Sequence, residues 1–122
     1  MFDIDNFKNI NDTYGHITGD HILQQITHIV KNLIRKADVF ARWGGEEFLI
    51  LCIETNINDA EILAEKLRQS IETASFIKVP QITSSFGVTD YRKQEDIDAF
   101  INRVDSAMYQ AKDEGKNRVV IV

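Results

Sequence analysis

The sequence predicts a mixed α/β (α+β) fold, in which a ferredoxin-like, mostly antiparallel sheet is covered by helices. Short apolar runs of strand length alternate with longer segments whose apolar residues recur at helical spacing, and a glycine-containing acidic turn separates two of the short runs. The resulting order is strand, helix, strand, strand, helix, strand, helix, strand. Because a strand, a crossover helix, a hairpin, a helix and a strand form the ferredoxin-like unit, we expect the helices on one face of the sheet.

Composition restricts the classes of protein to which the chain can belong. Its 122 residues suit one domain over residues 1–122, and 43% hydrophobic residues are ample for a core. A net charge of −5 argues against a nucleic-acid partner, and no apolar run approaches the roughly 20 residues of a membrane span. The lone Cys52 lies in an apolar run, which is typical of a core residue in a reducing compartment. We therefore expect a cytoplasmic domain without direct membrane contact.

The chain is predicted to begin with a strand and a helix. Residues 1–4 form the end of a buried strand. The helix begins near His16 or Asp20 and ends at Arg35. Its apolar residues recur at helical spacing, at Ile22, Ile26, Ile29, Val30 and Leu33.

Residues 42–48 read Arg-Trp-Gly-Gly-Glu-Glu-Phe and separate two apolar runs. This pattern predicts a hairpin, with strands near residues 38–43 and 47–53, whose turn presents carboxylates to solvent. Glycines there supply positive φ and let a ligand approach the backbone, and acids at such a tip can hold a hard cation and, through it, phosphates. Taken alone, such a segment is more often a solvated turn.

The second half of the chain continues with a helix, a strand, a helix and a final strand. The first of these helices is capped by Asn58 or Asp59, and its inward face carries Ala60, Leu63, Leu67 and Ile71. Residues 79–90 alternate as a strand does, with one side formed by Ile82, Ser84, Phe86 and Val88. A helix over residues 96–112 buries Ile97, Ile101, Val104 and Met108. A turn then leads to a strand over residues 118–122.

The start of the chain adds carboxylates at the end of the first strand. Asp3 and Asp5 stand where that strand ends, and ligands in open α/β sheets gather at such positions. In the predicted topology the first strand and the hairpin are neighbours, so Asp3 and Glu46 would meet at one edge of the sheet. Carboxylates from two neighbouring strands are what metal-dependent nucleotidyl transfer requires, and the palm of nucleotide polymerases has the same geometry.

Several segments together resemble a known family. They are residues 3–8 (Asp-Ile-Asp-Asn-Phe-Lys), 11–16, 19–20, the Gly44-Gly45-Glu46-Glu47-Phe48 signature, 85–88, 105–112 and 115–119. In order and spacing they resemble the GGDEF domain of diguanylate cyclases in its GGEEF variant, which has a nucleotidyl-cyclase-like fold. Family domains usually have a further helix and an Asp-x-Leu-Thr-Gly-Leu-x-Asn-Arg segment before the first strand. We therefore expect residues 1–122 to be such a domain lacking that segment, and to be less stable and less active alone.

The resemblance implies an enzyme that joins two GTP molecules into cyclic di-GMP and releases two pyrophosphates. One domain binds one GTP, so the implied active form is a homodimer, and the parent protein would carry an input or sensor domain. The implied cofactor is Mg²⁺ or Mn²⁺, held by Asp3, Glu46 and the carbonyl of Ile4. Glu47 would contribute to the catalytic carboxylates.

The resemblance also implies the residues that bind the substrate. Gly44 and Gly45 would let the backbone approach the nucleotide, and Asn11 and Asp20 would read the guanine edge. The β- and γ-phosphates would be neutralised by Lys8, Lys112 and Lys116. Many family members have Arg at the last of these positions, so we expect the charge here without the bidentate fork.

A second site is implied by the Arg35-Lys36-Ala37-Asp38 segment, which ends shortly before the signature. In the family this Arg-x-x-Asp marks an inhibitory site for dimeric cyclic di-GMP. A residue of the next helix completes the site, here Lys66 with Arg68 close by. Taken alone, the same pattern is also a common surface ion pair.

Two other functions stay open. A non-catalytic sensor that binds GTP or cyclic di-GMP would have the same fold, but such domains usually have a degenerate signature, whereas this signature is intact. Another palm-type nucleotidyl transferase would act on a different nucleotide.

Overall fold

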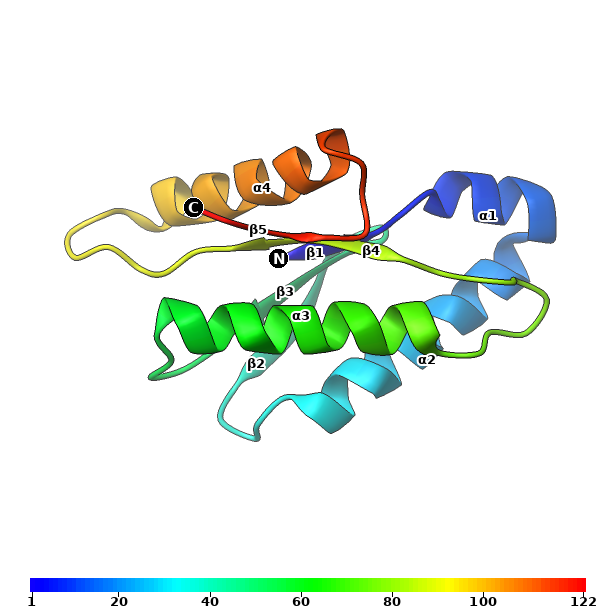
Figure 1. The fold of residues 1–122 in the computed structure, drawn as a ribbon, viewed down its shortest axis with the longest axis horizontal. Coiled ribbons are helices and arrows are strands. Elements are labelled where there is room, and N and C mark those ends of the chain that lie inside the picture. Colours follow the sequence, from blue (N-terminus) through cyan, green and yellow to red (C-terminus); the bar gives the residue numbers. More distant parts are fainter.

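The computed structural model describes all residues 1–122 and has one five-stranded sheet with helices packed on it (Figure 1). Along the chain the elements are β1 (Phe2–Ile4), α1 (Phe7–Tyr14), α2 (His16–Leu33), β2 (Val39–Gly44), β3 (Glu47–Leu51), α3 (Ile57–Thr73), β4 (Ser84–Val88), α4 (Ile97–Asp113) and β5 (Val119–Ile121). The strands lie in the order β2-β3-β1-β4-β5, and every neighbouring pair is antiparallel except β4 and β5. The predicted fold class is therefore confirmed.

Helices cover both faces of the sheet, whereas we predicted one. Figure 1 shows α4 on one side of the strands and α2 and α3 on the other. The reason is the alternation of side chains along the buried strands. Phe2 and Phe86 enter the core beneath α2 and α3, while Met1 packs on the opposite face against Val104 and Met108 of α4. A strand buried on both sides requires a helix on each.

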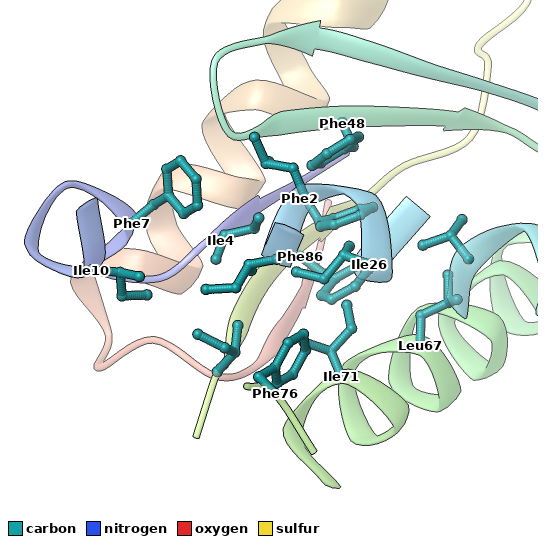
Figure 2. Packing of buried hydrophobic residues seen from close by; sticks show 14 of the residues in the cluster. Phe2, Ile4, Phe7, Ile10, Ile26, Phe48, Leu67, Ile71, Phe76 and Phe86 are labelled. Atoms are coloured by element: carbon teal, nitrogen blue, oxygen red, sulfur yellow. The ribbon is translucent and has the colours of Figure 1, made fainter. Parts of the chain in front are cut away.

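Stacked phenylalanines from neighbouring strands form the centre of the larger core. The ring of Phe2 lies 5.0 Å from that of Phe48 and 4.7 Å from that of Phe86 (Figure 2). The ring of Phe40 stacks on that of Phe48 and extends the stack to β2. Ile26 of α2 and Leu67 and Ile71 of α3 cover these rings. This packing fixes β1 in the middle of the sheet, so the residues that follow β1 start from a rigid position.

The helix predictions are mostly confirmed. Helix α2 begins at His16, and Asp96 caps α4 by accepting a hydrogen bond from the Ala99 N–H at 2.7 Å. The cap of α3 is Asn56 instead of Asn58 or Asp59, because its side chain accepts from the Asp59 N–H. None of the helices is both long and apolar enough to cross a bilayer.

Two predictions from the sequence are wrong or incomplete, and one helix was not predicted at all. Ile97 is 75% exposed, because it is the first residue of α4 and lies about two turns before the Val104 that contacts the sheet. Strand β4 spans only Ser84–Val88, and the buried Val79 and Ile82 precede it as irregular chain, where Pro80 cannot donate to a ladder. Helix α1 was not predicted from the sequence.

Gly87 sets the distance between β4 and α4. A Cβ added there would lie 2.4 Å from both the Met108 nitrogen and the Val104 oxygen, which are helix backbone atoms that cannot rotate away. The helix therefore lies directly on the strand, and this close contact holds the last turn of α4 beside the end of β1.

We predict that Gly87→Ala lowers the free energy of unfolding by about 3 kcal/mol, because the helix must move off the strand. Urea unfolding measures the change. Gly44→Ala is the matched control, since its nearest neighbour would be a Glu47 side-chain oxygen at 4.0 Å, and we expect a change within about 0.5 kcal/mol. Equal stability of the two variants would contradict the close packing of α4.

Candidate active site

The sheet register brings the signature turn to the end of β1. Asp3 lies opposite Glu47, and the Ile4 N–H donates to the Glu46 carbonyl at 3.3 Å. Gly45 has φ +46°, as a turn glycine requires, and the Arg42 side chain donates to its carbonyl at 2.7 Å. The acidic turn and the Asp3 strand end are therefore neighbours, as the sequence predicted.

Asp3 is a buried carboxylate with too little compensating charge. Its Oδ2 lies 2.8 Å from the Lys112 Nζ of α4. Burial raises the pKa of Asp3 to about 6, because the ion pair with Lys112 only partly offsets the desolvation, and the neighbouring Glu46 and Glu47 raise the pKa further. A cation bound beside Asp3 would therefore lower the cost of keeping this buried carboxylate charged.

The residues at this point fit a magnesium-type ion that is shared with a nucleotide. No three acidic, histidine or cysteine side chains form a ready-made cage. Mg²⁺ is usually held by one or two carboxylates together with substrate phosphates, rather than by protein alone. Asp3 and Glu46 supply hard oxygen ligands, and the strand register places them beside each other.

Two lysines lie at the same strand end, and a third lies on the helix that follows it. Lys112 contacts Asp3, and the Lys116 Nζ lies 2.6 Å from the Asn6 Oδ1, directly after β1. Lys8 is exposed in the first turn of α1. The structure therefore places Lys112 and Lys116 at this strand end, and Lys8 lies on the helix that follows it.

The predicted guanine-binding residues lie where α1 meets α2. The Asn11 Oδ1 is buried and has no hydrogen-bond partner. Gly19 lies against it, since a Cβ on Gly19 would be 1.8 Å from that oxygen. Asp20 is the next residue and is exposed. A buried amide oxygen without a partner is costly, and a donor on a ligand would satisfy it.

Helix α1, which the sequence analysis missed, carries Lys8 and Asn11. The spacing of Phe7, Ile10 and Tyr14 was the available signal, because these residues share a helical face that packs into the core. Asn6 precedes the helix with φ +56° and does not cap it with its side chain, so the usual helix-start signal is missing.

Asp5 is a structural acceptor at the strand end. Its carboxylate accepts hydrogen bonds from the Thr83 hydroxyl at 2.8 Å, the Ser85 hydroxyl at 2.6 Å and the Asn117 N–H at 3.0 Å. The carboxylate is thus occupied by hydrogen bonds within the protein. Asp5 ties β1 to β4 and to the turn that carries Lys116.

The predicted inhibitory residues lie at the opposite end of β2 from the signature turn. The Arg35 guanidinium contacts Asp38 at 3.1 Å, the Ile53 carbonyl at 2.8 Å and the Thr55 hydroxyl at 2.6 Å. Burial alone would raise the pKa of Asp38, but the hydrogen bonds and charge of Arg35 outweigh it and hold that pKa below its usual value. Arg35 remains more than half exposed and available to a ligand.

Of the two candidate cations on α3, only Lys66 is exposed. The Arg68 side chain is 12% exposed and is held by Glu65, Glu72 and Asn117. Arg68 therefore contacts the turn after α4, and Lys66 is the α3 cation that can meet a ligand.

Comparison with known proteins agrees with this geometry. The family model described as "Diguanylate cyclase, GGDEF domain" matches residues 1–118. This chain belongs to the GGDEF family. Diguanylate cyclases of this family are metal-dependent enzymes. The recognition made from the sequence motifs is confirmed.

Named relatives and solved structures support the assignment. Diguanylate cyclase A of Treponema denticola is 42% identical over an alignment of 125 positions. The alignment covers 99% of this chain and 34% of that protein, so the chain spans about a third of this curated relative. The active GGEEF domain of a diguanylate cyclase from Vibrio cholerae has a TM-score of 0.92 at 37% identity, over 98% of this chain and 78% of that one. The GGDEF domain of DgcB from Caulobacter crescentus, in complex with c-di-GMP, has a TM-score of 0.94 at 28% identity. The match covers 98% of this chain and 74% of that one.

The buried Asp3 predicts a distinctive dependence of stability on pH. Its pKa is about 6 in the folded protein and 3.8 for the free side chain, so the folded state binds this proton more tightly. The associated stability is present below about pH 4 and is lost as the pH rises through about 6. In the absence of metal, we expect the parent's unfolding free energy to fall by about 2 kcal/mol more than that of Asp3→Asn between about pH 4 and pH 7.

Urea unfolding at several pH values measures this difference. Asp12→Asn controls for the loss of one carboxylate, because Asp12 is exposed on α1, and it should follow the parent. Parallel pH curves for the parent and Asp3→Asn would contradict the electrostatic description of the site.

Proposed function

We propose that the domain condenses two GTP molecules into cyclic di-GMP and two pyrophosphates. The observation that carries the proposal is the meeting of the GGEEF turn, Asp3, Lys112 and Lys116 at one strand end. Two triphosphates and a transferred nucleotidyl group need carboxylates for a cation and positive charges for the phosphates, and this site supplies both. One domain offers one such site, so two domains face each other in a homodimer.

In this proposal each part of the site has a separate task. Asp3 and Glu46 hold Mg²⁺ or Mn²⁺, with the Ile4 carbonyl assisting, and the bound ion supplies Lewis acidity and lowers the pKa of the attacking hydroxyl. Gly44 and Gly45 have no side chain to block the nucleotide. The phosphates are bound by Lys8, Lys112 and Lys116.

The base is bound at the junction of α1 and α2. Asn11 offers its unpartnered oxygen to a guanine N–H, and the Asp20 carboxylate accepts from the neighbouring donors of the same edge. Adenine lacks this pair of donors, so the proposed site prefers GTP over ATP. Guanine specificity also separates this function from that of other palm-type nucleotidyl transferases.

Cyclic di-GMP is proposed to inhibit the enzyme through Arg35, Asp38 and Lys66. Arg35 is preorganised by Asp38 and Thr55 and still exposes much of its guanidinium, which suits a guanine edge or a phosphate. We also propose an input or sensor domain elsewhere in the parent protein. The alternative function is a non-catalytic domain that binds GTP or cyclic di-GMP.

We predict that Glu46→Gln lowers the rate of cyclic di-GMP formation from GTP and Mg²⁺ by about 100-fold or more, because it removes a metal-binding charge. Chromatography of the nucleotide products measures the rate. Glu61→Gln, on the exposed surface of α3, is the matched control and should keep the parent rate. Intact GTP with a folded, dimeric parent protein would favour the sensor, and an unaffected Glu46→Gln would refute the metal assignment.

We predict that Arg35→Ala raises the concentration of cyclic di-GMP that halves the initial rate by about tenfold or more, because the guanidinium is lost from the product site. Rates measured with increasing added product test this. Lys36→Ala removes an exposed neighbouring charge and should leave that concentration unchanged. The same value for Arg35→Ala and the parent would rule out this inhibitory site.

A further inference from the structure

The turn that carries Lys116 has an unusual backbone. Gly115, Lys116 and Asn117 have φ values of +119°, +64° and +47° in succession. Only the first of these residues is a glycine, and residues with a Cβ rarely adopt such angles. A strained turn of this kind persists only where surrounding contacts hold it. The contacts that hold this turn therefore also determine where the Lys116 ammonium lies.

Asn117 receives those contacts from two sides. Its backbone N–H donates to the Asp5 Oδ2 at 3.0 Å. Its side-chain Nδ2 donates to the Glu72 Oε1 at 2.9 Å, and its Oδ1 accepts from the Arg68 guanidinium at 2.7 Å. We call Asp5, Arg68, Glu72 and Asn117 the Asn117 clamp.

Both supports of the clamp are themselves fixed. Asp5 is 3% exposed and is held by the hydroxyls of Thr83 and Ser85. Arg68 is 12% exposed and pairs with Glu72 at 2.7 Å in the last turns of α3. The clamp thus connects the lysine turn to the sheet on one side and to α3 on the other.

We propose that the Asn117 clamp positions Lys116 for the β- and γ-phosphates of the bound nucleotide, an inference that rests on the proposed function. The alternative is a brace between α3 and the sheet. Leu67 and Ile71, which are almost fully buried, already provide that brace. The three hydrogen bonds instead converge on the residue next to Lys116, inside the strained turn. Arg68 and Glu72 are positioning residues, because they act through Asn117.

The test compares two glutamates on α3 that both pair with Arg68. Only Glu72 contacts Asn117, so Glu72→Ala opens the clamp and Glu65→Ala is the matched control. The probes are α,β-methylene-GTP, which resists attack at the α-phosphate, and GMP, which lacks the outer phosphates. We expect calorimetry to show that Glu72→Ala binds α,β-methylene-GTP about tenfold more weakly and GMP as well as the parent does. Glu65→Ala should change neither affinity.

A double-mutant cycle separates positioning from general destabilisation. If the clamp acts through Lys116, Glu72→Ala has no further effect on α,β-methylene-GTP affinity in a Lys116→Ala background. Additive losses, an equal loss of GMP affinity, or an unchanged Glu72→Ala would overturn the proposal. Asn117→Gly serves if Glu72→Ala does not fold, because glycine tolerates the positive φ and removes only the side-chain contacts.

Hydrogen exchange of the Asn117 N–H tests the clamp separately from the proposed synthesis of cyclic di-GMP. Faster exchange of the Asn117 N–H in Glu72→Ala, without nucleotide, supports the clamp whether or not the protein makes cyclic di-GMP. Unchanged exchange in a protein that does make cyclic di-GMP would refute the clamp and leave the cyclase standing. A parent protein that does not bind α,β-methylene-GTP would overturn both.

Discussion

The burial of two carboxylates at the end of β1 is the constraint on which the rest of the site depends. Asp3 and Asp5 are both 3% exposed, and each needs partners that only other parts of the chain can supply. Lys112 forms an ion pair with Asp3. Two hydroxyls at or next to β4 and the N–H of Asn117 donate hydrogen bonds to Asp5. These contacts bring the end of α4 and the turn after it to one strand end, together with Lys112 and Lys116, which we propose to bind phosphates.

The apolar core makes this arrangement possible. Phe2 stacks between Phe48 and Phe86, so the strand that carries Asp3 is held from both neighbouring strands. Gly87 lets α4 lie directly on β4, which sets the reach of Lys112 to Asp3. Packing thus supplies the rigidity, and Asp3 supplies the negative charge on which the proposed metal binding depends.

Residue patterns predicted those features that depend on residues close together in the sequence. The apolar spacing in α2, the turn glycines and the charged strand end could be read from neighbouring residues. The placement of α4 on the second face of the sheet could not be predicted in this way. It depends on the close contact between Gly87 of β4 and the α4 backbone, which forms only in the folded protein. The role of Arg68 was also hidden. Its partner Asn117 lies 49 residues away, and nothing in the sequence around either residue indicates that the two side chains meet.

The contacts of Arg68 also separate the proposed inhibitory site from the proposed phosphate site. Because Arg68 belongs to the Asn117 clamp, the proposed inhibitory site has Arg35 and Lys66 as its cations and shares no side chain with the phosphate site. Arg35 and Asp38 lie at the start of β2, and the signature turn follows its end. The β2–β3 hairpin is the covalent and hydrogen-bonded element that connects them. Within one domain, the proposed product site is therefore connected to the signature turn by this hairpin. Through Lys66 on α3, it is also connected by the Asn117 clamp to the turn that carries Lys116.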